Sequence, residues 1–228
     1  MSLSPALWQS LLLTFKLAAV TSVILLLIGI PLAHWLNTSS MKGIVFLETL
    51  ISLPIVLPPT VIGFYLLVLF APQNPLGATW LQLTGQTLAF SFWGLVAGSV
   101  IYSLPFAVQP FQAALKTIPP VLIESARISG ANRLQIFRHV VLPIARRGIG
   151  VGVTLSFAHT VGEFGLVLMI GGSIPGKTRV ASISLYDEVQ KLNYPQAHLL
   201  ALILLLAAFF LILVMNLLQR QEPDVTLS

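Results

Sequence analysis

Residues 117–147 read TIPPVLIESARISGANRLQIFRHVVLPIARR, a stretch that lies between two long apolar runs. Pro119 and Pro120 suit the start of a helix, where the missing N–H costs nothing. Gly130 suits the left-handed position that ends a helix. A second short helix is predicted over residues 133–139. The stretch is therefore predicted to form two short helices and not a disordered loop.

The stretch is also strongly basic and holds a single acid, Glu124. Positive residues near the ends of membrane helices are retained in the cytoplasm, so this loop is predicted to be cytoplasmic. Counting crossings outward places the amino terminus outside and the carboxyl terminus inside. Lys16 is the one positive charge that disagrees, and its long stem can snorkel to the outer interface. The basic residues of the loop are Lys116, Arg127, Arg133, Arg138, Arg146 and Arg147.

Apolar runs lie on both sides of the loop. Of the 228 residues 56% are hydrophobic and 8% are charged, whereas about 25% of a typical soluble domain is charged. A membrane-crossing helix needs about 20 mostly apolar residues. The chain is therefore predicted to be an all-α membrane protein, one transmembrane domain over residues 1–228 with the loop at 116–147. Five runs qualify as spans: residues 11–36, 44–70, 90–115, 144–170 and 198–218.

Composition excludes several other classes of protein. The chain has no Cys, which excludes disulfides, thiolate nucleophiles and Cys-ligated metals. Its net charge of +5 is spread over short hydrophilic gaps, so it is interpreted as a topology signal and not as a nucleic-acid surface. The first basic residue is Lys16, and no cleavage pattern follows, which argues against a cleaved signal peptide.

The second apolar run contains three prolines within SLPIVLPPTVIG, residues 52–63. Pro54, Pro58 and Pro59 each remove a backbone donor and clash with the preceding turn, so a regular helix is not expected there. Broken backbone at membrane depth is tolerated only where protein or a water-filled path covers it. Two interpretations stay open on the residues alone: a proline kink packed against a neighbour, or a wall of a translocation path.

Glu163 is an acid inside the fourth run, about seven residues from its predicted outer end. Such a charge is costly in a membrane and normally has a partner. His159 lies four residues earlier on the same helix face, a spacing that allows a hydrogen bond or an ion pair between the two side chains. We expect an internal hydrogen-bonded clamp at a helix packing surface. A proton relay or a metal site is the alternative, but two side chains make an incomplete metal site. We expect no metal and no cofactor.

The predicted loop carries more apolar side chains than so small a structure can bury. We expect them to contact either lipid headgroups or a partner protein, and the residues alone leave both open. These side chains are Val121, Leu122, Ile123, Ile128, Leu134, Ile136 and Phe137.

The loop also resembles a known family. Glu124-Ser125-Ala126, then Gly130, then Leu142-Pro143 resemble the E-A-A, G and L-P pattern of the binding-protein-dependent importer permeases, with Ser125 in place of the usual first Ala. In that family the loop is a coupling helix seated in a cleft of a separate ATPase subunit. The resemblance therefore favours a protein partner over lipid.

Three further stretches are similar to the molybdate permeases and their close relatives, the sulfate permeases: residues 53–59, 161–165 and 173–178. The resemblance implies a type I ABC importer permease fold in the inner membrane, two copies of the permease, two ATPase subunits, and an extracytoplasmic oxyanion-binding protein. It implies no catalytic residue on this chain. The path or gate is expected to include Pro54, Pro58, Pro59, Glu163, Phe164 and Gly165.

Molybdate is the expected substrate, with sulfate or tungstate as the alternative. An ion-coupled secondary transporter ranks behind, because intramembrane charges suited to ion coupling are scarce. An intramembrane enzyme ranks lower still, since no H-E-x-x-H site or paired carboxylates are present.

One motif is instead typical of nucleotide-binding proteins. GGSIPGKT, residues 171–178, fits the phosphate-binding pattern G-x-x-x-x-G-K-T. That pattern works between a strand and a helix of a nucleotide-binding domain, whereas here it follows a predicted membrane span, and Pro175 lacks an N–H donor. We therefore expect an extracytoplasmic turn and no nucleotide site.

Overall fold

The computed structural model describes residues 3–220, apart from the side chain of Arg220, so both ends of the predicted 1–228 domain lie outside the described residues. Within that part every regular element is helical. The elements are α1 Pro5–Thr38, α2 Ile44–Ser52, η1 Leu53–Ile55, α3 Pro59–Phe70, α4 Pro75–Thr84, α5 Phe92–Lys116, α6 Pro120–Ile128, α7 Arg133–Ile136, the π-helical turn η2 Phe137–Val141, α8 Leu142–Gly162, α9 Gly165–Gly171, α10 Ala181–Gln190 and α11 Tyr194–Arg220.

Four helices in the described part are long and apolar enough to cross a membrane: α1, α5, the continuous helix Arg133–Gly162, and Tyr194–Gln219 of α11. A fifth crossing results if the broken pair Ile44–Ile55 and Pro59–Phe70 counts as one span. The all-α membrane fold with about five spans is thus confirmed.

Two of the predicted runs are not single helices. Within 44–70 the chain bends by 108° between η1 and α3, as three prolines in six residues require. Within 144–170, α8 stops at Gly162 and α9 begins at Gly165. The predicted span over 144–170 thus contains a break between two helices, which the sequence did not indicate. Periodicity and length could not show this break, because bonds from other helices hold the intervening residues.

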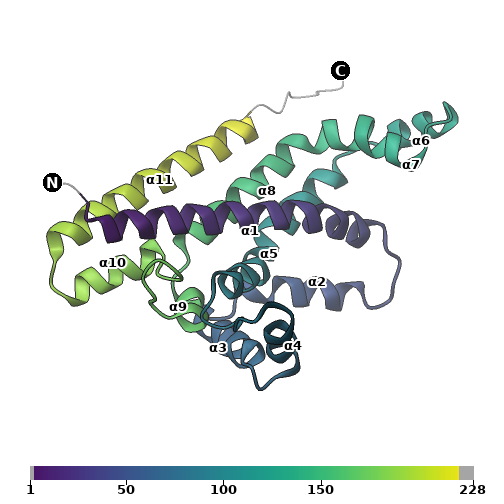
Figure 1. Cartoon of the computed structure of the whole chain (residues 1–228). Helices are drawn as coiled ribbons and strands as arrows, with labels where there is room; N and C mark the ends of the chain where they lie inside the picture. The colour runs from purple at the N-terminus through teal and green to yellow at the C-terminus, as the bar shows by residue number, and fades with distance from the viewer. Residues whose placement is uncertain (1–2, 221–228) are drawn as a thin grey trace.

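The centre of the bundle is formed by α1, α5 and α8, which pack against one another (Figure 1). Phe111 of α5 is fully buried between two glycines of the neighbouring helices. A Cβ added at Gly29 of α1 would lie 3.0 Å from the Phe111 ring, and one added at Gly152 of α8 would lie 2.6 Å from it. The absent side chains therefore let a large ring sit between closely spaced helices, a common device in membrane bundles.

Figure 1 shows α6 and α7 at one end of the long helices, with the start of α1 and α10 at the opposite end. The shorter elements α3, α4 and α9 form a lobe on one side of α1 and α5. Neither α4 nor α10 was predicted, since each has only ten residues and a search for 20-residue spans passes over them. The two candidate regions lie in different places: the α6–α7 loop at one end, and the break after α8 beside the lobe.

Candidate functional site

The loop at the end of the bundle has the predicted two-helix form. Glu124, Ser125 and Ala126 lie on α6, and Gly130 follows it with φ of 81°. The backbone N–H of Gly130 donates to the carbonyl of Arg127 at 2.9 Å, so the left-handed glycine closes the helix end as predicted.

Helix α7 starts with a reciprocal cap. The Asn132 side chain accepts from the backbone N–H of Gln135 at 2.9 Å, and the Gln135 side chain accepts from the N–H of Asn132 at 2.8 Å. Both donors at the start of this short helix are therefore satisfied. The loop is therefore held in a defined shape by its own hydrogen bonds.

Not all of the apolar side chains predicted at the loop surface are there. Ile136 is buried, and Ile123 and Phe137 pack against the core formed by α1, α5 and α8, so the prediction that these three are exposed was wrong. The neighbouring helices α5 and α8 supply the burial that the loop alone could not. The side chains that remain exposed are Val121 at 61%, Leu122 at 42%, Ile128 at 88% and Leu134 at 74%.

Leu142 and Pro143 lie at the start of α8, and both are exposed. Pro143 has no N–H, and its ring would crowd the carbonyl of His139 in a regular helix. The preceding turn η2 widens to π geometry, with the N–H of Leu142 bonded to the carbonyl of Phe137. The L-P pair thus marks a widened turn inside one continuous helix from Arg133 to Gly162.

The proline-rich bend between η1 and α3 packs against α9. Pro54 is buried in η1, whereas Val56 is 85% exposed at the bend and Pro58 is exposed beside it. A Cβ added at Gly165 would lie 3.1 Å from Cγ of Pro59. Two of the predicted path residues, about a hundred positions apart in the sequence, are therefore in contact.

Glu163 occupies the gap between α8 and α9, and it is only 5% exposed. Its Oε2 accepts a hydrogen bond from Ser99 Oγ of α5 at 3.0 Å, and its backbone carbonyl accepts one from Ser182 Oγ of α10. Its Oε1 is buried without a hydrogen-bond partner. The break after α8 is therefore tied to α5 and α10 through this one residue.

His159 is not the partner of Glu163. Its Nδ1 lies 2.9 Å from Ser103 Oγ, and its ring stacks on Phe106 with centroids 3.9 Å apart. The structure shows neither a hydrogen bond nor an ion pair between His159 and Glu163, so the pairing that the spacing allowed does not form. The chain becomes extended at Glu163, with φ of −70° and ψ of 134°, which removes the helical spacing that pairing requires.

The serines that hydrogen-bond to Glu163 and His159 were not predicted from the sequence. Ser99 and Ser103 are four positions apart on one face of α5, and both are fully buried. That spacing was a usable signal, because hydroxyls repeated on one face of an apolar membrane helix tend to bond across to a neighbour. Phe164 follows Glu163, and its ring centroid lies 5.2 Å from that of Tyr186 in α10.

The GGSIPGKT stretch connects α9 to α10 and has no strand beside it in the described part of the chain. The backbone N–H groups of Lys177, Thr178 and Arg179 all donate to the carbonyl of Ile174. The Thr178 hydroxyl is buried and donates to the carbonyl of Gly171 at 2.6 Å. Because the loop bonds to itself through a carbonyl at its centre, those donors are not directed at a phosphate.

Among residues 3–220, no three or more His, Asp and Glu side chains gather into a cluster suited to a metal ion.

The sequence matches the family model of the binding-protein-dependent transport system inner membrane component over residues 25–222. The chain belongs to this family. It is therefore an inner-membrane, multi-pass transport component, in agreement with the apolar spans.

Several relatives within this permease family are similar over most of their length. The molybdenum transport system permease protein ModB of Azotobacter vinelandii is 49% identical over 83% of this chain and 84% of its own. ModB of Escherichia coli strain K12 is 34% identical over 80% of each chain. The sulfate transport system permease protein CysT of Salmonella typhimurium is 34% identical over 91% of this chain and 75% of its own.

Solved structures confirm the permease fold. A bacterial ABC transporter that imports the acidic polysaccharide alginate has a chain with a TM-score of 0.75 and 19% identity, covering 96% of this chain and 81% of that one. The MetNI methionine ABC transporter in an inward-facing form gives a TM-score of 0.71 and 17% identity, covering 98% of this chain and 100% of that one.

Proposed function

We propose that this chain is the membrane-spanning permease subunit of an importer that carries molybdate across the inner membrane, driven by a separate ATPase subunit. The observation that carries the proposal is the α6–α7 loop, which projects at one end of the bundle (Figure 1). Four of its large apolar side chains are exposed. A rigid, capped loop with such a surface fits a cleft in a partner protein. The similar solved structures, which are chains of ABC transporters, support an ATPase as that partner.

One continuous helix joins this loop to the break between α8 and α9. The helix from Arg133 to Gly162 contains 30 residues, so at 1.5 Å per residue it spans about 45 Å. It ends at Glu163, which Ser99 and Ser182 tie to α5 and α10. Movement of the loop by the ATPase is therefore transmitted along one helix to the break. Glu124, Ser125, Ala126, Gly130, Leu142 and Pro143 form the coupling region at the near end of this helix.

The break in turn contacts the proline-rich bend through Gly165 and Pro59. Pro54, Pro58, Pro59, Glu163, Phe164 and Gly165 are proposed to line or gate the path. Glu163 is a positioning residue in this scheme, because its charge would repel an anion and both its carbonyl and Oε2 are bonded to other helices. Coupling then requires only that the ATPase favour one of two helix arrangements.

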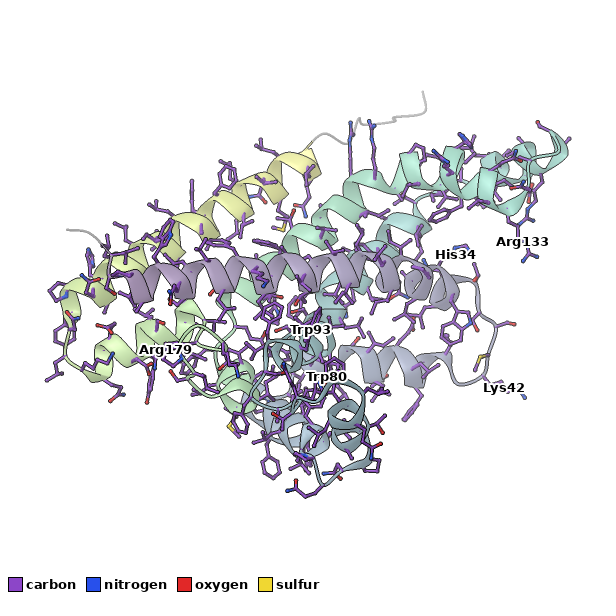
Figure 2. The ribbon with its side chains drawn as sticks, in the orientation of Figure 1. His34, Lys42, Trp80, Trp93, Arg133 and Arg179 are labelled. Atoms are coloured by element: carbon purple, nitrogen blue, oxygen red, sulfur yellow. The ribbon has the colours of Figure 1, made fainter. Side chains whose placement is uncertain are left out.

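The proposed assembly contains two copies of this chain, two ATPase subunits and an extracytoplasmic oxyanion-binding protein. Helix α11 supports the pairing of copies or contact with lipid, because only 6% of its most apolar window is buried within the chain. The cytoplasmic side is assigned to the α6–α7 loop, with the amino terminus outside and the carboxyl terminus inside. Figure 2 supports this assignment, since Lys42 and Arg133 lie toward the same end of α1.

Molybdate is favoured over sulfate by the 49% identity to the Azotobacter vinelandii permease, against 34% to the sulfate permease. Sulfate and tungstate remain the competing substrates. The arrangement of His159 and Glu163 does not favour an ion-coupled transporter, because serines of α5 bond to both side chains.

The test is uptake into vesicles that contain the permease, its ATPase and its binding protein. We expect ATP-dependent uptake of molybdate, with hydrolysis stimulated by molybdate more than by sulfate. Uptake that persists without the ATPase would refute the energy source, and stimulation by sulfate alone would refute the substrate.

Topology is tested separately with single cysteines, since the chain has none of its own. Ser129→Cys is expected to react with an impermeant maleimide only from the cytoplasm, and Tyr194→Cys only from outside.

A further inference from the structure

A hollow of about 470 Å³ lies where α1, the start of α5 and the loop before α10 meet. Lys16 of α1 and Lys177 of the GGSIPGKT loop both line it, together with Gln86 and Thr87 of the turn before α5. Trp93, labelled in Figure 2 near the start of α5, forms part of the apolar wall. The residues are far apart in the sequence, and only the fold brings these two lysines to one hollow.

Neither lysine has an acidic partner in the described part of the chain. The salt bridges there join Arg179 to Asp187 and Lys191 to Glu188, and no acid lines the hollow. The Lys16 ammonium lies 4.8 Å from the centre of the Phe92 ring, which is a weak contact compared with an ion pair. Two uncompensated positive charges thus share one concave surface, where a negative ligand is stabilised.

The turn that carries Gln86 and Thr87 is fixed in place, but the side chains of these two residues are not engaged by the rest of the described chain. The turn that carries Gln86 and Thr87 is tied to α9 by the Phe90 N–H, which donates to the carbonyl of Ile170 at 2.9 Å. Phe90 has φ of 58°, a backbone conformation that a non-glycine residue keeps only when its surroundings impose it. The side chains of Gln86 and Thr87 make no hydrogen bond within the described structure, so their donors are free for a ligand.

Lys177 is directed outward by the bonds of its own loop. The Thr178 hydroxyl is buried and closes the loop, whereas Lys177 beside it is exposed. Lys16, the positive charge that disagreed with the predicted topology, lines the same hollow.

We propose that this hollow is a binding site for a tetrahedral oxyanion. Lysine ammonium groups provide three donors each, and amide and hydroxyl donors complete the coordination of an anion whose oxygens point in four directions. Two sources have this chemistry: a free dianion such as molybdate, or the phosphate of a lipid headgroup. Assignment to free molybdate rests on the proposed function, and a site on the outer side would raise the local concentration of the anion before transport.

Binding of molybdate to the full chain, purified with its ATPase in detergent, is the primary measurement, made by equilibrium dialysis. Lys16→Gln and Lys177→Gln are each expected to weaken binding about tenfold, and the double variant about a hundredfold. Lys177→Arg should retain binding within about threefold, since it keeps the charge. Lys191→Gln is the matched control, because it removes an outer lysine that lies outside the hollow and pairs with Glu188.

The second measurement distinguishes the sources. Phosphatidylglycerol retained by the wild-type protein and by each variant is counted by mass spectrometry after purification. Lysine-dependent molybdate binding assigns the free anion, and lysine-dependent lipid retention without molybdate binding assigns the headgroup phosphate. If the double variant equals wild type in both measurements, the inference is refuted. The vesicle uptake assay separates the two proposals: uptake with lysine-independent binding refutes the site alone, and a lysine-dependent site without uptake refutes the transport function alone.

Discussion

Two isoleucines of the α6–α7 loop provide a direct test of coupling. Ile128 is 88% exposed, whereas Ile136, eight residues later, is 7% exposed. Replacing Ile128 with Ala removes three carbons that are largely exposed in the isolated chain but would be buried against the ATPase. At about 0.8 kcal/mol per buried carbon the loss is about 2 kcal/mol, or roughly thirtyfold in the dissociation constant.

The same substitution at Ile136 has a different expected result. That side chain is already packed in the core, so its removal leaves a cavity and costs about 2–5 kcal/mol of folding stability. The melting temperature should fall by at least about 4 °C. Ile128→Ala should leave the melting temperature unchanged.

Both variants are measured in detergent, with affinity for the ATPase taken from a binding titration and stability from intrinsic tryptophan fluorescence on heating. Each variant thus serves as the control for the other. If Ile128→Ala bound the ATPase within twofold of wild type, the exposed face of α6 would not be the coupling surface. If Ile136→Ala melted like wild type, the described packing of the loop would be wrong.

Three further predictions concern the membrane break and the outer loop. Ser99→Ala leaves the Glu163 carboxylate without its one side-chain hydrogen bond and should cost about 1–3 kcal/mol in thermal unfolding; an unchanged melting temperature would contradict the clamp. Gly63→Ala places a Cβ 2.7 Å from Cβ of Met169 and should lower the free energy of unfolding by about 1–3 kcal/mol. Gly162→Ala is the control and should be tolerated, because its added Cβ has nothing within 4 Å. Equal effects of the two variants in urea unfolding would exclude tight packing of α3 on α9. The pKa of Glu188 is lowered by the hydrogen bond that this carboxylate accepts from the Lys191 side chain. The stabilising effect of Glu188 is therefore present above the ordinary carboxyl pKa and is lost as the pH falls through the lowered value. Glu188→Gln should flatten this acid-side fall in a pH series of melting temperatures, and an unaltered pH dependence would refute the assignment.

Much of the fold could be predicted from the sequence because it depends on local properties. Apolar runs of about 20 residues specify crossings wherever the solvent is hydrocarbon, and prolines 54, 58 and 59 specify a break in any surroundings. The two-helix form of the α6–α7 loop was predicted for the same reason, since Pro119, Pro120 and Gly130 act on their own backbone.

The tertiary structure decided what those local rules leave open. Whether Ile136 is buried depends on which helices lie beside the loop, and whether α8 continues past Gly162 depends on hydroxyls from α5 and α10. Likewise, Lys16 and Lys177 share a hollow only because the chain folds back on itself over about 160 residues. A sequence pattern specifies the conformation of a segment, whereas the partner of a buried polar group is set by contacts between segments, and those contacts have no fixed spacing in the sequence.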